Sequence, residues 1–330
     1  MRLGVIVRAD RRGLAYQSGE LYRALKPDVT VAVDMRQRPA HERWIHDFDQ
    51  YPDAIVTTWP ESNNRFNRRA VEALLSCDVI YSAETFYDDR LMQLANKKRI
   101  ATVRHVNCEL YWSEGESHPI YPTTWRLPGR PEGPTVPVPI PDDRIAEKPA
   151  GDGLLLHVGG WKAKHDRNGT QMVRNTLRRT DRPWRITAQY GRAVGNDPNV
   201  EVMTEVEDRW AMYEGCSVLV MPRKYGGLCL PAQEAAARGL ALVMTDTAPQ
   251  NGWPIVPLAV RKFTVKARHV SATDLFHADP RQIAEVVDGL VGDTLTEAQE
   301  RALGWAQSLA WSKWAPIYRK MFEKAAEEMT

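Results

Sequence analysis

The residues from Val218 to Asp246 hold the clearest chemical signal of the chain. They read VLVMPRKYGGLCLPAQEAAARGLALVMTD, which predicts a buried parallel strand, a glycine turn, a short helix and a second strand. Pro231 suits the first helical position, and Gly239 ends the predicted helix. Glu234 is then expected in the first helical turn, where the positive helix end keeps a carboxylate ionised. Such a carboxylate can accept hydrogen bonds from two vicinal hydroxyls, so the segment predicts a site for a diol.

At these residues the chain resembles retaining glycosyltransferases of the two-domain GT-B architecture, in particular family four, whose motif is roughly P-S-x-x-E-G-F-G-L-P-x-x-E-A-x-A-x-G. The matching positions are Pro222, Gly227, Leu230, Pro231, Glu234, Ala235, Ala237 and Gly239. The resemblance implies that Glu234 binds the nucleotide ribose of a sugar-nucleotide donor. Gly226 departs from the motif, because it stands where the family has a glutamate that contacts the donor sugar. Backbone amides would have to replace that contact, so Gly226, Gly227 and Leu228 are counted as donor-binding candidates.

Strand and helix signals alternate along the chain, which is typical of open parallel sheets covered by helices on both faces. The expected strands are Leu3–Val7, Val29–Val33, Ala54–Thr57, Val79–Ser82, Ile100–Arg104, Leu154–Val158, Arg185–Tyr190, Val200–Met203, Val218–Met221 and Leu240–Thr245. The expected helices of the first half are Gln17–Leu25, Phe66–Leu75 and Asp88–Asn96. A length of 330 residues exceeds what one core usually supports, so two domains are expected.

The region from Ser113 to Lys148 is rich in proline, which predicts an extended linker before the second domain. We therefore expect an α/β fold with two doubly wound, Rossmann-like domains that face a cleft. Their expected limits are 1–148 for an acceptor-side domain and 149–308 for a nucleotide-sugar domain. Residues 309–330 are predicted to form a helix with an aromatic packing face, and the GT-B resemblance implies that it crosses back onto the first domain.

Composition excludes several classes of protein. Hydrophobic residues make up 43% and charged residues 26%, which is ordinary for a globular protein. The sequence contains no run of 18 apolar residues that would predict a membrane segment. Four cysteines without CxxC spacing predict neither a disulfide framework nor a zinc site, so a location in a reducing cytoplasm is expected. For an enzyme encoded by a phage, this would be the cytoplasm of the host. The acidic pairs Asp88-Asp89 and Asp142-Asp143 lie outside the expected strand-end loops. We therefore predict no metal, and no cofactor besides the donor substrate.

Ligands of doubly wound sheets bind beyond the carboxyl ends of the strands, so the loops there are expected to carry donor-binding residues. Gly13 follows the first strand and would let a diphosphate approach the next helix, although a simple flexible turn is the alternative. The loop after Leu154–Val158 joins Gly160 and the cations Lys162, Lys164 and Arg167 to a helix start, a combination that suits a diphosphate. The resemblance matches Arg167 best to the family's phosphate-binding residue; solvated surface cations are the other interpretation.

Further candidates follow other strands. Arg223 and Lys224 precede the glycine turn and could reach the same phosphates or face solvent, and Tyr190 ends a strand at which relatives contact the nucleobase. His105 closes Ile100–Arg104, similar to a family histidine beside the donor sugar, and is the predicted reaction-centre residue. Its alternative is a structural role. Glu109, in the same loop, is a lesser catalytic candidate as a base, with acceptor binding as its alternative role.

The acceptor is less clearly encoded. A net charge of +2 does not mark a nucleic-acid binder, yet arginines gather in loops of the first half. Arg11, Arg12, Arg65 and Trp59 are predicted to contact the acceptor, and their chemistry suits a polyanion such as DNA or a phosphorylated glycan. A genome that favours arginine is the alternative. Segments such as RKYGGLCLP also resemble transferases of bacteriophages and bacterial polysaccharide clusters, whose acceptors include hydroxymethylated DNA bases and virion proteins.

These signals together predict a metal-independent, retaining glycosyltransferase with a nucleotide-diphosphate sugar as donor, a UDP-sugar being favoured. The acceptor would be modified phage DNA, a protein or a glycan. A sugar-nucleotide epimerase of the same architecture is one alternative and would need additional carboxylates. A non-catalytic binding protein descended from a transferase is the other, and the glycine at position 226 favours it.

Overall fold

The computed structural model describes residues 1–37, 45–59, 64–88, 90–106, 118–125, 131–160, 166–188, 198–204, 208–267 and 270–330, with backbone alone at 160, 188, 264–267 and 270–273. The chain forms two compact units. Unit 1 comprises Met1–Pro139 and Trp311–Thr330, and unit 2 comprises Ile140–Ala310. No helix among the described residues is both long enough and apolar enough to cross a membrane.

Unit 1 is built on a six-stranded parallel sheet in the order β3-β2-β1-β4-β5-β6. Its strands are β1 Leu3–Arg8, β2 Val29–Asp34, β3 Ile55–Thr58, β4 Val79–Ala83, β5 Ala101–His105 and β6 His118–Ile120. Its helices are α1 Gly13–Leu25, α2 Arg68–Leu74, α3 Leu91–Lys97 and α8 Trp311–Glu327. The doubly wound prediction is confirmed for this unit.

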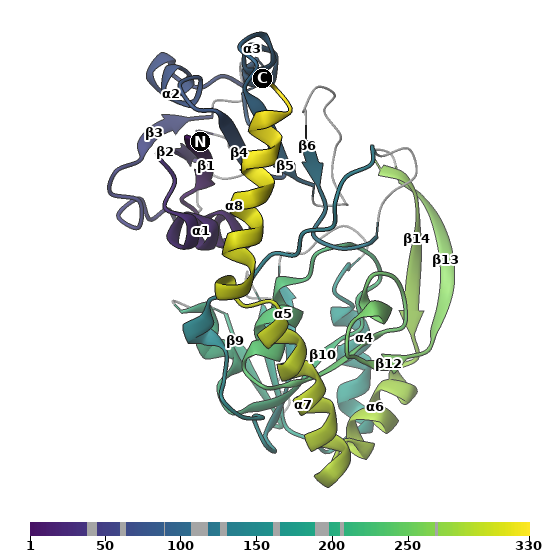
Figure 1. Cartoon of the computed structure of the whole chain (residues 1–330). Coiled ribbons are helices and arrows are strands. Elements are labelled where there is room, and N and C mark those ends of the chain that lie inside the picture. The colour runs from purple at the N-terminus through teal and green to yellow at the C-terminus, as the bar shows by residue number, and fades with distance from the viewer. Residues whose placement is uncertain are drawn as a thin grey trace. The chain divides into compact units, whose positions relative to one another are not determined.

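Alternate residues of the central strands of unit 1 supply two cores, one on each face of the sheet. Val5 and Val7 of β1 pack in the core that contains α1 and α8, whereas Ile6 packs with α2 and α3. The last helix, yellow in Figure 1, buries Phe322 completely in the first of these cores, and the Tyr318 hydroxyl donates to the carbonyl of Pro137 at 2.9 Å. The C-terminal helix therefore completes the first domain, as predicted.

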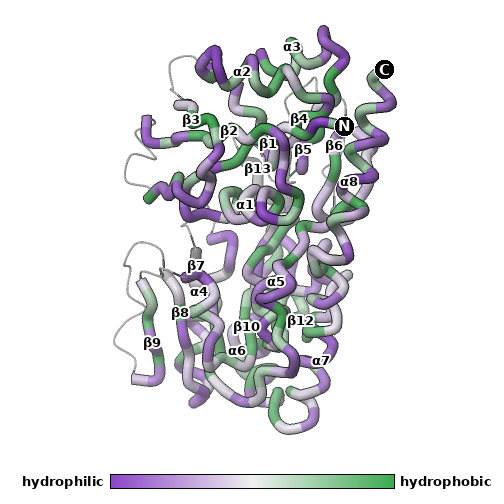
Figure 2. Tube along the Cα trace, turned by 60° about the vertical axis from the view of Figure 1, so that its left-hand side comes forward, coloured by the Kyte–Doolittle hydropathy of each residue, from purple (hydrophilic) through white to green (hydrophobic). Residues whose placement is uncertain are grey.

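Unit 2 repeats the plan with the sheet order β12-β11-β10-β7-β8-β9. Its sheet strands are β7 Leu154–Gly160, β8 Trp184–Ala188, β9 Val200–Met203, β10 Cys216–Met221, β11 Ala241–Thr245 and β12 Val256–Leu258. Its helices are α4 Thr170–Thr176, α5 Leu230–Ala237, α6 Pro280–Gly289 and α7 Gly292–Ser308, with shorter 3-10 turns η2 Asp142–Arg144, η3 Leu177–Arg179, η4 Arg209–Tyr213 and η5 Gln250–Gly252. Every residue of β10 is buried, and Figure 2 colours most of this central strand as hydrophobic.

An antiparallel ribbon extends unit 2 beyond the doubly wound plan (Figure 1). It consists of β13 Val260–Ala267 and β14 Val270–Ala278, which pair from Val260 with Ala278 to Ala267 with Val270. The sequence pattern did not predict this ribbon or β12. The ribbon contacts the loop after β10, where the Phe276 N–H donates to the carbonyl of Lys224 at 2.9 Å.

The proline-rich segment differs from the predicted linker. β6 forms there as an edge strand that pairs with β5, a place where Pro119 is tolerated because only one side of the strand needs donors. Ile140 joins unit 2, since it is buried and its N–H donates to the carbonyl of Leu309 at 2.9 Å. The chain therefore passes from one unit to the other at Pro139–Ile140 and again at Ala310–Trp311, whereas the predicted limits were 148 and 308.

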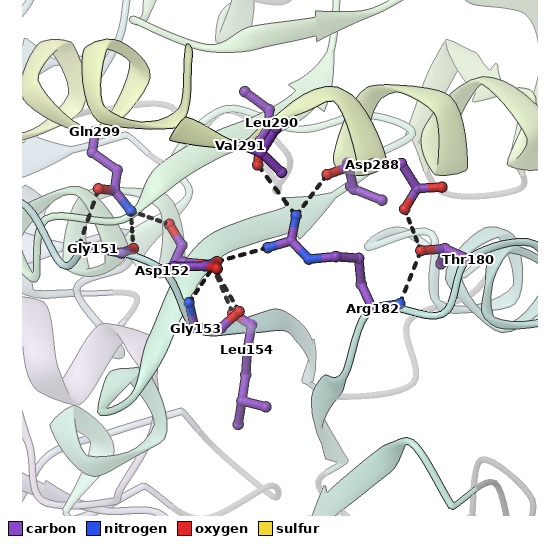
Figure 3. A network of polar contacts seen from close by, with 12 residues as sticks. Gly151, Asp152, Gly153, Leu154, Thr180, Arg182, Asp288, Leu290, Val291 and Gln299 are labelled. Atoms are coloured by element: carbon purple, nitrogen blue, oxygen red, sulfur yellow. Dashed lines mark hydrogen bonds and ion pairs between the residues drawn. The ribbon is translucent and has the colours of Figure 1, made fainter. Parts of the chain in front are cut away.

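Arg182 ties three parts of unit 2 together (Figure 3). Its Nη1 donates to the carbonyls of Val287 and Leu290, at 2.9 and 3.2 Å, at the end of α6, and its Nη2 lies 3.2 Å from Oδ1 of Asp152. Carbonyls at a helix C-terminus have no partner within the helix, so a guanidinium there satisfies groups that otherwise need water.

Arg182→Ala should lower the free energy of unfolding by about 2 kcal/mol, because it removes hydrogen bonds from a charged donor. Urea denaturation followed by circular dichroism measures the change. Arg178→Ala is the matched control, since that residue is exposed on η3, and it should change stability by less than about 0.5 kcal/mol. Equal stability of the two variants would contradict the role of Arg182.

Candidate functional site

The chain order of the strands in unit 2 reverses between β7 and β10, which lie side by side in the sheet. Such a reversal is the place where doubly wound sheets bind ligands, beyond the carboxyl ends of the two strands. The loops that follow β7 and β10 carry most of the predicted donor-binding residues. The described ones in these loops are Arg167, Arg223, Lys224, Gly226, Gly227 and Leu228, while Gly160 ends β7 and Glu234 lies in α5, which follows the second loop.

The two loops are packed against each other. The N–H of Lys224 donates to the carbonyl of Arg167 at 2.8 Å. Gly169 has a φ of +76°, and a Cβ at that position would lie 2.3 Å from the carbonyl oxygen of Pro222. Only glycine permits this approach, so the loops after β7 and β10 form one continuous surface.

Gly226 adopts a φ of +115°, a conformation that side chains of L-residues rarely tolerate. This is the position at which the motif has a glutamate. The backbone of the turn is thus incompatible with that residue, and the difference from the motif is one of conformation as well as of side chain.

Arg223 is buried behind the turn, with 2% of its surface exposed. Its Nη1 donates to the carbonyl of Leu228 at 2.7 Å, and its own carbonyl accepts a hydrogen bond from the Thr245 hydroxyl at 2.6 Å. The Arg223 guanidinium thus holds the end of the glycine turn at Leu228. Its predicted contact with phosphate remains a prediction.

The start of α4, where an anion site was expected, is paired with a side-chain carboxylate. The carboxylate of Asp166 accepts hydrogen bonds from the N–H groups of Thr170 and Gln171, at 2.9 and 3.0 Å, and its Oδ2 lies 3.3 Å from Nζ of Lys224. A side-chain carboxylate occupies these helix amides in this arrangement, and their binding of a diphosphate remains a prediction. Arg167 lies half-buried next to this carboxylate in the chain.

Glu234 lies at the fifth residue of α5, beyond the first turn in which it was expected, because the helix begins at Leu230. Two side chains offset its charge instead of the helix end. The Tyr213 hydroxyl donates to Oε2 at 2.7 Å, and Nε of Arg209 lies 3.3 Å from Oε1. Only 7% of the Glu234 surface is exposed.

Sequence reasoning missed Arg209 and Tyr213. They come from η4, a short turn after β9 whose start is capped by Asp208, which accepts a hydrogen bond from the N–H of Trp210 at 3.0 Å. An aspartate at a helix start was the available signal, but no spacing rule relates Tyr213 to a glutamate 21 residues further along the chain.

In unit 1, the predicted reaction-centre residue His105 is completely buried. Its Nε2 lies 2.8 Å from the carbonyl of Val136, which can only accept, so Nε2 carries the proton and Nδ1 accepts from the Tyr81 hydroxyl at 3.1 Å. Burial lowers the pKa of His105 from 6.5 to about 4. This geometry gives His105 a packing role, and its catalytic role remains a prediction.

The other predicted residues of unit 1 are not brought into one group by any described contact. Arg11 and Arg65 are exposed, and Gly13 begins α1 with Arg12 as its N-cap. Trp59 packs edge-on against Tyr87, with ring centroids 5.1 Å apart. Four further predicted residues lie outside the described part of the chain: Glu109, Lys162, Lys164 and Tyr190.

No metal-binding group is found within the described ranges, where no three His, Cys, Asp or Glu side chains gather suitably. Three of the four cysteines are described, and Cys77, Cys216 and Cys229 are all free and buried.

Two doubly wound parallel sheets, with the last helix on the first unit, define the GT-B class of proteins. The solved structures with this fold include Anabaena HepE (Alr3699) in complex with UDP and glucose, at a TM-score of 0.69 and 10% identity, covering 98% of this chain and 100% of that one. Sucrose-phosphate synthase from Thermosynechococcus elongatus has a TM-score of 0.65 at 12% identity, covering 98% and 100%. AviGT4, a glycosyltransferase involved in avilamycin A biosynthesis, has a TM-score of 0.60 at 13% identity, and the match covers 99% of this chain and 98% of that one.

Residues 179–273 match the family model of the glycosyl transferases group 1. The matched segment runs from η3 into β14 and contains both Glu234 and its partners Arg209 and Tyr213. A search of curated proteins found no match. The family match over residues 179–273 and the GT-B fold together support a glycosyltransferase.

The burial of His105 predicts a pH dependence of stability. Because the folded state lowers the pKa of His105 from 6.5 to about 4, the neutral ring stabilises the fold fully above pH 6.5, and this stabilisation is lost as the pH falls towards 4. The loss amounts to about 3 kcal/mol. His105→Gln should be less stable than the wild type at pH 7, and the difference should shrink by pH 4.5.

Urea midpoints of both proteins at several pH values measure this difference. Other titrating groups, including the buried His157, are common to both proteins and cancel in the comparison. A difference that stays constant from pH 7 to pH 4.5 would contradict the prediction.

Proposed function

We propose that this glycosyltransferase moves a sugar from a nucleotide-diphosphate sugar, with a UDP-sugar favoured, to a hydroxyl group, without a metal and with retention of configuration. The observation that carries the proposal is the buried carboxylate of Glu234 beyond β10, at the reversal of strand order. A carboxylate there suits the two vicinal hydroxyls of a ribose. The HepE structures with UDP and with UDP-glucose support a uridine donor.

In the proposed reaction, the bond between the sugar's anomeric carbon and the diphosphate oxygen breaks, and its electron pair leaves with the nucleotide. The acceptor oxygen forms the new bond on the same face of the sugar, and its proton passes to the departing phosphate oxygen. This route needs no strong protein base, which agrees with the neutral, buried state of His105. Retention itself rests on the resemblance to family four.

Charge on the departing diphosphate has to be offset by cations and backbone amides. Arg167, Arg223 and Lys224 are the described cations on the loops after β7 and β10, and Lys162 and Lys164 precede them in the sequence. Because Lys224 pairs with Asp166 at 3.3 Å, we propose that a phosphate oxygen replaces this carboxylate as the partner of Lys224 when the donor binds.

One observation favours a second candidate, a sugar-nucleotide-binding protein without turnover. Gly226, at a φ of +115°, leaves the turn without the acidic side chain of the motif. UDP-, GDP- and TDP-sugars tested by thermal shift and donor hydrolysis distinguish the candidates. Slow hydrolysis supports a transferase, binding without turnover supports the second candidate, and interconversion of two sugars would reveal an epimerase.

Glu234→Ala should weaken UDP binding by about 10- to 100-fold, because hydrogen bonds to a charged group contribute about 1.5 to 3 kcal/mol. Isothermal titration calorimetry with UDP measures the effect. Glu285→Ala is the matched control, since Glu285 is exposed on α6, and it should bind UDP like the wild type. Undiminished affinity of Glu234→Ala would overturn the proposed site.

For the acceptor, we propose a polyanion and choose a DNA duplex with hydroxymethylated cytosine as the probe, with a protein or a neutral glycan as the alternatives. Arg11→Ala and Arg65→Ala should each reduce the slope of log affinity against log salt by about one, as expected when a phosphate contact is lost. Arg178→Ala, in unit 2, is the control. Unchanged slopes in both variants would exclude these arginines from a DNA contact.

A further inference from the structure

The short turn η4 directs two hydrogen-bond donors at the two oxygens of one carboxylate. Tyr213 donates to Oε2 of Glu234 at 2.7 Å, while Nε of Arg209 lies 3.3 Å from Oε1. All three side chains are nearly excluded from solvent: Tyr213 is 1% exposed, and the side chains of Arg209 and Glu234 are 10% and 9% exposed. Each oxygen of Glu234 is therefore oriented by a separate group.

Neighbouring groups fix η4 itself. The guanidinium carbon of Arg209 lies 5.1 Å from the ring centroid of Trp210, and that of Arg144 lies 5.8 Å from the same ring. Asp208 accepts a hydrogen bond from the N–H of Trp210 at 3.0 Å. An arginine held in this way loses little further side-chain freedom when it binds a carboxylate, whereas a lysine cannot reproduce its planar geometry.

The chemistry of the carboxylate defines what remains available for a ligand. An ionised carboxylate accepts at about four lone-pair positions, and Tyr213 and Arg209 each use one. Burial and the charge of Glu234 raise the pKa of Tyr213 well above 10, so its hydroxyl stays protonated and keeps donating. One acceptor position on each oxygen is then left for two hydroxyls of a ligand.

We propose that Tyr213 and Arg209 are positioning residues which fix the rotation of the Glu234 carboxylate, and that this fixed orientation makes the site select a ribonucleotide over a 2′-deoxyribonucleotide. The inference rests on the proposed function, in which Glu234 binds the ribose. A freely rotating carboxylate would still accept a single hydroxyl. Two hydroxyls held in a fixed relative geometry need both oxygens in place, and a 2′-deoxy sugar leaves one acceptor unpaired, which costs binding energy.

The test measures the ratio of dissociation constants for 2′-deoxy-UDP and UDP by calorimetry. We expect the wild type to prefer UDP by about tenfold or more, since an unpaired buried acceptor costs at least about a factor of ten. Tyr213→Phe keeps the ring and removes the hydroxyl, and Arg209→Lys keeps the charge and removes the planar fork. Both variants should reduce the ratio towards one, mainly by weakening UDP binding.

Arg178→Lys is the control, because Arg178 is exposed on η3, and it should leave the ratio unchanged. Thermal unfolding of each variant checks the fold, and Tyr213→Phe alone suffices if Arg209→Lys does not fold. Addition of Tyr213→Phe to Glu234→Ala should change the ratio no further, because positioning acts only through Glu234.

The possible outcomes distinguish the ribose contact of Glu234 from the positioning roles of Tyr213 and Arg209. An unchanged ratio in Glu234→Ala would overturn the proposed ribose contact, and the positioning roles with it. A ratio that collapses in Glu234→Ala but stays at the wild-type value in Tyr213→Phe and Arg209→Lys would overturn the positioning roles alone. Loss of thermal stability with an unchanged ratio would show that Tyr213 and Arg209 only support the fold.

Discussion

A carboxylate that is buried away from water must be paired, and in unit 2 this requirement links Glu234 on α5 to η4. Glu234 is 7% exposed, and helix geometry places it too far along α5 for the helix end to stabilise its charge. The compensation has to come from another part of the chain, namely η4, which lies between β9 and β10. η4 directly precedes β10 and α5 follows it, so β10 separates the two partners in the chain.

Much of the fold could be predicted from the sequence because buried parallel strands are continuous apolar runs bounded by turn residues. Val218–Met221 and Leu240–Thr245, for example, correspond closely to β10 and β11. The ribbon β13–β14 could not be predicted in this way, because its strands carry mixed polar and apolar residues and no short glycine turn joins them. Proline density also misled the prediction: it excludes central strands, but it does not prevent an edge strand such as β6.

The candidate site was predictable in its location but less so in its pairing. Strand-end loops and a motif were enough to place Glu234, Arg223 and Lys224 in the segments that follow β10. Which groups they contact depends on distances between distant segments, and no sequence pattern carries that information. Asp166 illustrates the difference, since a residue that looks like part of a cationic loop neutralises Lys224 and binds the first amides of α4. His105 likewise lies at a strand end, yet burial makes it part of the core.

Gly226 has a consequence for how this protein can evolve. Glycine and glutamate are one nucleotide apart in the genetic code for some codons, so the acidic residue of the motif is easily reached by mutation. A backbone held at a φ of +115° resists that change, because the new side chain would force the turn braced by Arg223 to rearrange. The loop conformation therefore favours glycine at position 226. A descendant of this protein regains an acidic residue there only after the backbone of the turn has changed its conformation.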